Sequence, residues 1–236
     1  MTRGRLYLIP VPLGETPAAA VLPPPVQACA QRLTHFVAEN ARSARAFLKS
    51  LASDWPLQQI EIHELNAHTP AGRLPQLLAP ALAGSDLGLI SEAGCPAVAD
   101  PGAGLVALAH REGIQVMPLV GPSSILLALM GSGLSGQSFA FHGYLPSETR
   151  AREKRLRELE KQSRQEGQTQ IFIETPYRNR QMLESLLRAC SPDTRLCLAT
   201  DLTLTSEEIG TRRIDQWQGG EAPEINRRPT VFLFQA

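Results

Sequence analysis

The fold is decided by the stretch Ser91-Glu92-Ala93-Gly94-Cys95-Pro96-Ala97-Val98-Ala99-Asp100-Pro101-Gly102. It follows a short apolar run, Asp86–Ser91, and precedes the helix-like segment Gly104–Glu112. Glycine lets the backbone take conformations closed to other residues, and proline fixes the shape of a loop in advance. An apolar run, a Gly/Pro loop and a helix in that order are typical of a parallel sheet covered by helices.

Two more loops of this kind follow predicted strands. Ile9–Glu15 ends the strand expected at Arg5–Pro10, and Val120–Ser124 ends the strand expected at Gln115–Leu119. Loops beyond the carboxyl ends of parallel strands converge on the ligand crevice of such a sheet. We therefore expect a ligand site here, which Gly94, Gly102 and Gly121 allow the backbone to approach closely. Neither a Walker phosphate loop nor a dinucleotide fingerprint is present in the sequence.

The remaining elements of the first half are read from apolar periodicity. Strands are expected at Leu33–Ala38 and Gln59–His63, and a helix at Ser43–Ala52. The Pro- and Ala-rich segment Leu13–Pro25 is interpreted as an irregular loop. Pro122–Gly131 is apolar all round, with proline at a first helical position, and predicts a buried helix.

The second half has a different pattern. Helices are expected at Thr149–Gln165, with the i,i+4 pairs Glu153/Arg157 and Glu160/Arg164, and at Tyr177–Cys190. Several strands follow one another without helices, which favours a mixed sheet, and they are expected at Ser138–Gly143, Thr169–Glu174, Arg195–Thr200, Glu207–Arg212 and Thr230–Gln235. The predicted fold is α/β with two domains, residues 1–144 with a parallel sheet and residues 145–236 with a mixed sheet.

Composition excludes several classes of protein. The formal net charge is zero, so no global field attracts the chain to nucleic acid or to a membrane surface. The four cysteines form no C-x-x-C pair, and the five histidines have no metal-ligand spacing. The longest apolar run, Ile125–Met130, is too short to cross a bilayer. We expect a soluble cytoplasmic protein with reduced thiols, no metal and no membrane association.

The motifs together resemble those of the tetrapyrrole methylase fold family, in particular the branch that contains ribosomal RNA small subunit methyltransferase I. The matches run in order along the chain from about residue 5 to residue 210. They are Pro10–Gly14, Ala38–Arg42, Ser91–Gly102, Val120–Ser123, Phe141–Pro146 and Phe172–Arg178.

This resemblance implies a cofactor and its binding residues. S-adenosyl-L-methionine would lie folded in a cleft between the two domains, held mostly by backbone groups. Carried over by position, the contacts are Pro12, Glu92, Ala93, Gly94, Val98, Ala99, Ser123 and Ser124 from the loops, with Tyr144 and Leu202 from the second domain. The resemblance also implies a homodimer, and a role in ribosomal RNA processing through methylation of a ribose 2′-hydroxyl.

The chain departs from the family pattern at several motifs, and these changes affect acceptor recognition more than cofactor binding. The family's Arg-Glu-Leu-Thr-Lys is Thr200–Leu204 here, without either basic residue. Asn40 and Glu92 each replace an aspartate. We interpret the chain as a divergent paralogue. Two alternatives stay open, a methyltransferase for a tetrapyrrole or other small molecule, and a catalytically inactive S-adenosylmethionine-binding protein.

Candidates for chemistry are few. A hydroxyl acceptor requires removal of a proton, for which Asp201 and Glu39 are candidates, with ion-paired or solvated carboxylates as the alternative. Cys95 is interpreted as a packed thiol. An RNA substrate predicts that basic groups gather at one mouth of the cleft, namely Arg150, Arg152, Lys154, Arg155, Arg212, Arg213, Arg227 and Arg228.

Overall fold

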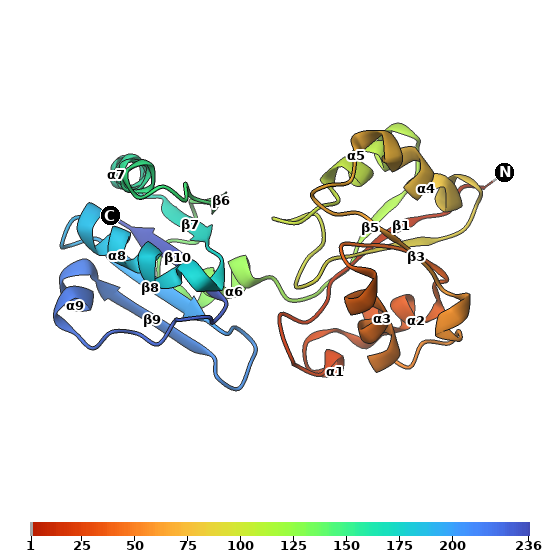
Figure 1. Ribbon diagram of the computed structural model, residues 1–236, viewed down its shortest axis with the longest axis horizontal. Helices are drawn as coiled ribbons and strands as arrows, with labels where there is room; N and C mark the ends of the chain where they lie inside the picture. Colours follow the sequence, from red (N-terminus) through yellow and green to blue (C-terminus); the bar gives the residue numbers. More distant parts are fainter. Residues whose placement is uncertain (1) are drawn as a thin grey trace. The chain divides into compact units, whose positions relative to one another are not determined.

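The computed structural model describes residues 2–236, which form two compact units (Figure 1). The first unit comprises residues 2–123 and the second residues 124–236. This division differs from the boundary near residue 145 that the sequence predicts. The reason is that the helix at Ser124–Ser132 and the strand at Phe139–Tyr144 both pack with the second sheet.

A five-stranded parallel sheet forms the centre of the first unit. Its strands lie in the order β3-β2-β4-β1-β5, and every pairing is parallel. The prediction of a parallel sheet is therefore confirmed. The strands are β1 (Leu6–Ile9), β2 (His35–Ala38), β3 (Glu61–Glu64), β4 (Leu87–Ile90) and β5 (Val116–Pro118).

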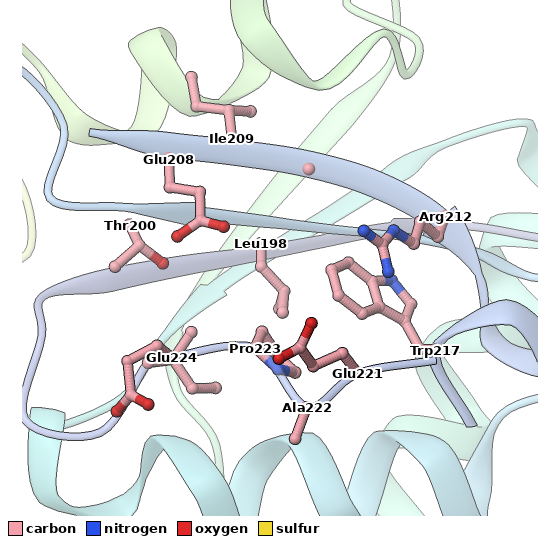
Figure 2. A pocket seen from close by; sticks show the side chains of 12 residues that line it. Leu198, Thr200, Glu208, Ile209, Arg212, Trp217, Glu221, Ala222, Pro223 and Glu224 are labelled. Atoms are coloured by element: carbon pink, nitrogen blue, oxygen red, sulfur yellow. The ribbon is translucent and has the colours of Figure 1, made fainter. Parts of the chain in front are cut away.

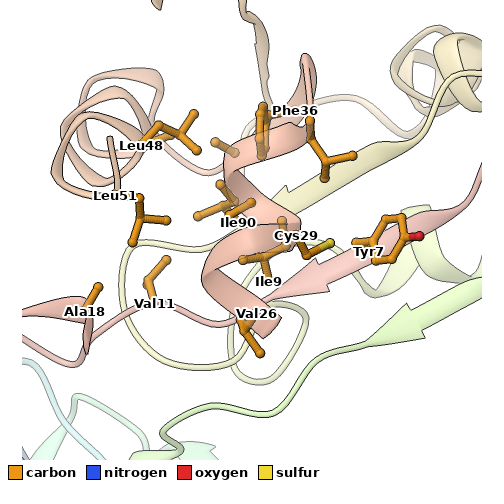
Figure 3. Packing of buried hydrophobic residues seen from close by; sticks show 14 of the residues in the cluster. Tyr7, Ile9, Val11, Ala18, Val26, Cys29, Phe36, Leu48, Leu51 and Ile90 are labelled. Atoms are coloured by element: carbon orange, nitrogen blue, oxygen red, sulfur yellow. The ribbon is translucent and has the colours of Figure 1, made fainter. Parts of the chain in front are cut away.

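Helices cover both faces of this sheet because strand residues alternate between two apolar clusters. Tyr7 and Phe36 pack with α2 and α3 in one cluster (Figure 3), whereas their neighbours Leu6 and Val37 pack with α4 and α5 in the other. The helices of the unit are α1 (Ala18–Val21), α2 (Pro24–Arg32), α3 (Ala41–Ser50), α4 (Leu74–Leu82) and α5 (Ala103–Arg111), with 3-10 turns η1 (Leu57–Gln59) and η2 (Ala71–Arg73).

The segment Leu13–Pro25 is interpreted from the sequence as an irregular loop, and this is wrong for the part that forms α1 and for the part that begins α2. The segment contains α1, and its last residues begin α2. Proline fits the first turn of a helix, where its missing N–H has no partner to lose, so the Pro23–Pro25 run starts a helix here. The sequence analysis also missed α4, which carries Pro80 inside it.

The second unit is built on a mixed sheet with the order β6-β7-β10-β8-β9. Its β6 and β7 are parallel, and the other neighbouring pairs are antiparallel, which confirms the prediction of a mixed sheet. The strands are β6 (Phe139–Tyr144), β7 (Thr169–Ile173), β8 (Arg195–Thr200), β9 (Glu208–Arg213) and β10 (Thr230–Gln235).

The helices of this unit are α6 (Ser124–Ser132), α7 (Thr149–Glu166), α8 (Asn179–Ala189) and α9 (Ile214–Gly219), with the 3-10 turn η3 (Pro176–Arg178). The helix α6 lies over β8, β9 and β10. The prediction of a buried helix holds for only part of it, because Ala128 and Leu129 are buried whereas Met130 is 79% exposed. An apolar sequence shows that a helix can be buried, and only its neighbours decide on how many sides.

Ion pairs on α7 confirm one prediction and correct another. Glu153 pairs with Arg157 at 3.5 Å, as its spacing predicts. Glu160 is instead buried and accepts hydrogen bonds from Ser191 and Thr194, while Arg164 pairs with Asp193. In residues 2–236 no helix is both long and apolar enough to span a membrane.

Candidate functional site

The three strand-end loops of the first unit are held together by direct contacts. Val11 and Gly94 exchange two backbone hydrogen bonds of 3.0 and 3.2 Å, which join the first loop to the second. The Cys95 thiol donates to the Pro122 carbonyl at 3.4 Å and so joins the second loop to the third. The predicted convergence of these loops at the carboxyl edge of the sheet is present in the structure.

The second loop has an unusual backbone between Gly94 and Gly102. Gly94 has φ 71° and Gly102 has φ 135°, and two alanines, Ala97 and Ala99, have φ of 65° and 64°. A residue with a Cβ rarely adopts a positive φ, and such strain persists only where the surroundings enforce it. The segment is thus shaped by its neighbours, the pattern seen at ligand-binding loops.

Two of the three glycines expected to let a ligand approach the backbone, Gly102 and Gly121, make room for other parts of the same chain. A Cβ on Gly121 would lie 2.3 Å from Pro10 Cβ, and a Cβ on Gly102 would lie 2.9 Å from Leu89 Cδ2. These two glycines therefore allow the unit's own chain to pack closely. At Gly94 a Cβ would lie 3.1 Å from Leu13 Cδ2, so its positive φ is the stronger constraint there.

A cavity of about 400 Å³ opens beside the first two loops. Its volume lies within the usual range for small-molecule sites. Its wall combines loop residues with residues of α3, and they are Val11, Pro12, Gly14, Glu15, Thr16, Ser43, Ala44, Ala46, Phe47, Ser50, Ile90, Ser91 and Glu92. Two residues predicted to bind the cofactor, Pro12 and Glu92, are among them.

Three carboxylates influence one another at this edge of the sheet. Burial raises the pKa of Asp100 to about 6, with a further contribution from the nearby Glu39 and Glu92 charges, while a hydrogen bond from Ser91 opposes the rise. Burial, followed by the Glu92 charge, also raises the pKa of Glu39. Such a group of acids favours a positively charged ligand, because a cation relieves their mutual repulsion.

The other predicted cofactor contacts lie on the same loops or in the second unit. Ala93, Val98 and Ala99 are exposed on the second loop, and Ser123 ends the first unit. In the second unit, Ser124 begins α6, Tyr144 is 56% exposed at the end of β6, and Leu202 is buried.

The candidate proton acceptor Asp201 is held in an ion pair. Its carboxylate is 7% exposed and accepts from Arg228 Nε at 2.8 Å and from Ser206 Oγ at 2.8 Å. Arg228 also donates to the Ser206 carbonyl and pairs with Glu208. Of the alternatives for Asp201, the structure favours the ion-paired carboxylate.

Five of the eight basic groups predicted to meet RNA contact other groups of the second unit, whereas Arg150, Lys154 and Arg227 form no ion pair among the described residues. Arg152 is only 2% exposed and donates to Ser185 and to the Ser147 carbonyl, so the prediction that it meets phosphates is wrong. Arg155 pairs with Glu158, and Arg213 pairs with Asp215. A helical sequence does not reveal which of its charges turn toward a neighbouring helix.

The second unit has a cavity of about 390 Å³ that the sequence analysis missed (Figure 2). Gly210 on β9 is among its lining residues, and the Arg212 guanidinium lies 4.7 Å from the Trp217 ring centre. A glycine inside a predicted strand is the signal that could have indicated it. Among the residues that the structure describes, no group of three or more His, Cys, Asp or Glu could hold a metal ion.

Comparison with known proteins shows the family to which this chain is related. Residues 5–217 match the family described as Tetrapyrrole (Corrin/Porphyrin) Methylases. The chain is 32% identical over 232 residues to the ribosomal RNA small subunit methyltransferase I of Xylella fastidiosa, which covers 98% of this chain and 81% of that protein. It is 37% identical to the enzyme of the same name from Vibrio cholerae over 145 residues, 61% of this chain and about half (49%) of that protein.

Solved structures agree on the fold. The methyltransferase CobJ has a TM-score of 0.65 at 21% identity and matches 99% of this chain and 95% of its own. The Thermus thermophilus uroporphyrin-III C-methyltransferase, solved with S-adenosylhomocysteine, has a TM-score of 0.56 at 16% identity, with 98% and 97% of the two chains matched. The chain belongs to the tetrapyrrole (corrin/porphyrin) methylases, a family of S-adenosylmethionine-dependent methyltransferases.

Proposed function

We propose that this protein methylates a ribose 2′-hydroxyl of small-subunit ribosomal RNA in the cytoplasm. The observation that carries the proposal is the relation to the Xylella enzyme over 98% of the chain. A tetrapyrrole acceptor is the competing assignment, and it is supported by structures that are at most 21% identical.

The residues of the first unit suit the cofactor by their chemistry. S-adenosylmethionine supplies, when bound, an electrophilic methyl group on a sulfonium. The joined loops offer backbone groups for it at Pro12, Ala93, Val98 and Ala99, and Ser123 follows them. The backbone N–H and C=O of Gly94 are engaged by Val11, so Gly94 acts by shaping the loop through its positive φ. The carboxylates of Glu39, Glu92 and Asp100 provide the negative potential that a sulfonium and an ammonium group favour. All of these cofactor contacts stay predictions, including those of Ser124, Tyr144 and Leu202 in the second unit.

The protein then has two tasks in methyl transfer. Its loops hold donor and acceptor in line and exclude water, since this displacement needs little more than positioning. As the new C–O bond forms and the C–S bond breaks, the hydroxyl proton must leave. We propose that one of the two carboxylates of Glu39 and Asp100 accepts that proton, because a carboxylate of raised pKa is a stronger base than an ordinary one.

Replacing Gly94 by valine is expected to abolish cofactor binding. Gly94 has φ 71°, which a β-branched residue does not adopt without strain, and its two bonds to Val11 fix the loop. Calorimetry with S-adenosylmethionine and S-adenosylhomocysteine measures the effect. Gly72→Ala is the control, because its Cβ would enter open space. Failure of the unmodified protein to bind either compound at millimolar concentration would contradict the cofactor assignment.

Replacing Asp100 by asparagine is expected to stabilise the protein at alkaline pH. The folded pKa, about 6, lies above the ordinary 3.8, so ionisation of Asp100 costs stability as pH rises through 6. Below pH 3.8 the carboxyl is protonated in both states, and that cost is absent. Melting temperatures across this range should show the variant above the wild type only on the alkaline side. Equal melting curves at all pH values would refute the raised pKa.

Deletion of the gene is expected to remove one 2′-O-methylated nucleoside from small-subunit ribosomal RNA. Mass-spectrometric mapping of RNA from cells with and without the gene measures this, and re-expression of the wild type should restore the nucleoside. Identical maps, together with accumulation of an under-methylated tetrapyrrole, would favour the competing acceptor. Identical maps with intact cofactor binding and no such accumulation would indicate a protein that binds without catalysis.

We also propose a homodimer, as the resemblance implies. Met130 on α6 presents a large apolar side chain to solvent, which a second copy would cover. Light scattering should give about twice the chain mass of 25.7 kDa, and Met130→Glu should shift the protein toward that single-chain mass. A wild type of single-chain mass throughout the micromolar range would contradict the dimer.

A further inference from the structure

The helix α3 has three distinct faces, one of which lines the cavity of about 400 Å³ beside the first two loops. Asn40 caps the helix through bonds to the Arg42 and Ser43 amides. Ala44 and Leu48 are buried in the core cluster of the first unit (Figure 3). One remaining face carries Arg42, Arg45 and Lys49, and the other lines the cavity with Ser43, Phe47 and Ser50. Both sets have spacings that place their members on one side of a helix.

The basic face of α3 is not neutralised by its surroundings. The ten residues of α3 include three cations and no acid. Arg45 donates to the Leu57 carbonyl, and within residues 2–236 neither the Arg42 guanidinium nor the Lys49 ammonium group forms an ion pair. On α7, Arg155 and Arg157 pair with glutamates, whereas Arg150, Lys154 and Lys161 form no ion pair among the described residues. The helix α3 differs in that it carries no acid at all. The charges of α3 are thus available to an external anion.

The cavity beside this face suits an uncharged, partly planar group. Phe47 contributes a half-buried aromatic ring, and Val11 and Ile90 add apolar surface. The hydroxyl groups of Ser43 and Ser50 donate to the Asn40 and Phe47 carbonyls, and Ser43 also lies 3.4 Å from Glu92, so toward a ligand these oxygens act as hydrogen-bond acceptors. Because Glu15 and Glu92 also line the wall, a phosphate is repelled from the interior and attracted to the basic face outside.

We infer that α3 binds the acceptor strand of the RNA, with backbone phosphates on Arg42 and Lys49 and an unpaired nucleotide in the cavity against Phe47. Proteins that read RNA take up splayed nucleotides in this manner, with bases stacked on aromatic rings and cations along the backbone. The inference rests on the proposed RNA methyltransferase function and assigns the acceptor site to helix α3. The site brings the nucleotide beside Glu92, at the edge of the sheet where the carboxylates lie.

The basic face is tested by the double variant Arg42→Gln/Lys49→Gln. Its matched control is Arg73→Gln/Arg111→Gln, which removes two exposed cations at η2 and α5, by the opposite face of the sheet. The probe is small-subunit ribosomal RNA purified from cells that lack the gene, in filter binding over a range of salt. Each lost phosphate contact should reduce the slope of log affinity against log salt by about 0.7 to 0.9. The control should retain the wild-type slope.

The cavity is tested by Ala46→Leu, which adds an apolar side chain to its wall from an exposed helical position. Ala107→Leu on α5 is the matched control at another exposed alanine. We expect Ala46→Leu to raise KM for the RNA several-fold and to change the affinity for S-adenosylmethionine much less in calorimetry, because Ala46 lies on the α3 side of the cavity and the predicted cofactor contacts Pro12 and Glu92 lie on its loop side. That split separates loss of the acceptor site from general unfolding, which would weaken both.

The outcomes distinguish this inference from the function on which it rests. If the wild type methylates the RNA and both α3 variants match it in affinity, salt slope and KM, the α3 assignment is overturned and the function stands. If the wild type binds cofactor but neither binds nor methylates the RNA, the RNA function itself fails and the α3 assignment falls with it. Loss of RNA affinity in both α3 variants with intact cofactor binding supports the inference.

Discussion

The two hydrogen bonds between Val11 and Gly94 are the constraint on which the site of the first unit depends. Each contributes only about 1 kcal/mol to stability, yet together they tie the loop after β1 to the loop after β4. The contact of Pro10 with Gly121 and the Cys95–Pro122 bond extend this connection to the loop after β5. With three loops joined, the positive φ values of Ala97 and Ala99 are imposed by the fold.

Negative and positive side chains lie in separate groups at the carboxyl edge of the parallel sheet. The negative group suits a cationic methyl donor, and the positive group suits a phosphate-bearing acceptor. Burial, with a further contribution from the Glu39 and Glu92 charges, raises the pKa of Asp100 to about 6, and this group of acids favours a cationic donor and a proton acceptor. The helix α3 lines the cavity with one face, and its next face presents Arg42 and Lys49 to solvent without an ion-pair partner among the described residues. A donor with a sulfonium and an acceptor strand with phosphates make complementary demands, and the first unit provides both potentials.

Sequence reasoning failed at residues whose role depends on distant neighbours. The sequence gives Arg152 the appearance of a surface cation on a charged helix, but Ser185 from α8 and the Ser147 carbonyl satisfy its donors in the interior. Asp201 looks like a free base, but Arg228 lies 27 positions further on and neutralises it. The Pro23–Pro25 run predicts a loop, but proline is also tolerated in the first turn of a helix, and here it begins α2. For Arg152 and Asp201 the deciding partner is distant in sequence. For the proline run the local sequence is compatible with both a loop and a helix start.

The order of the elements, both sheet types and the loops of the site could be predicted because they depend on local rules. Alternating apolar residues require strands, and the Gly and Pro positions of residues 91–102 require a shaped loop at a strand end. The sequence by itself thus determined the sheets, the positions of the site loops and the family. Tertiary structure alone decided which charges are paired and that α3 lines the cavity. It also decided that Gly102 and Gly121 make room for other segments of the same chain and not for a ligand. The physical reason is that burial and ion pairing depend on distances between segments far apart in sequence, which local pattern does not encode.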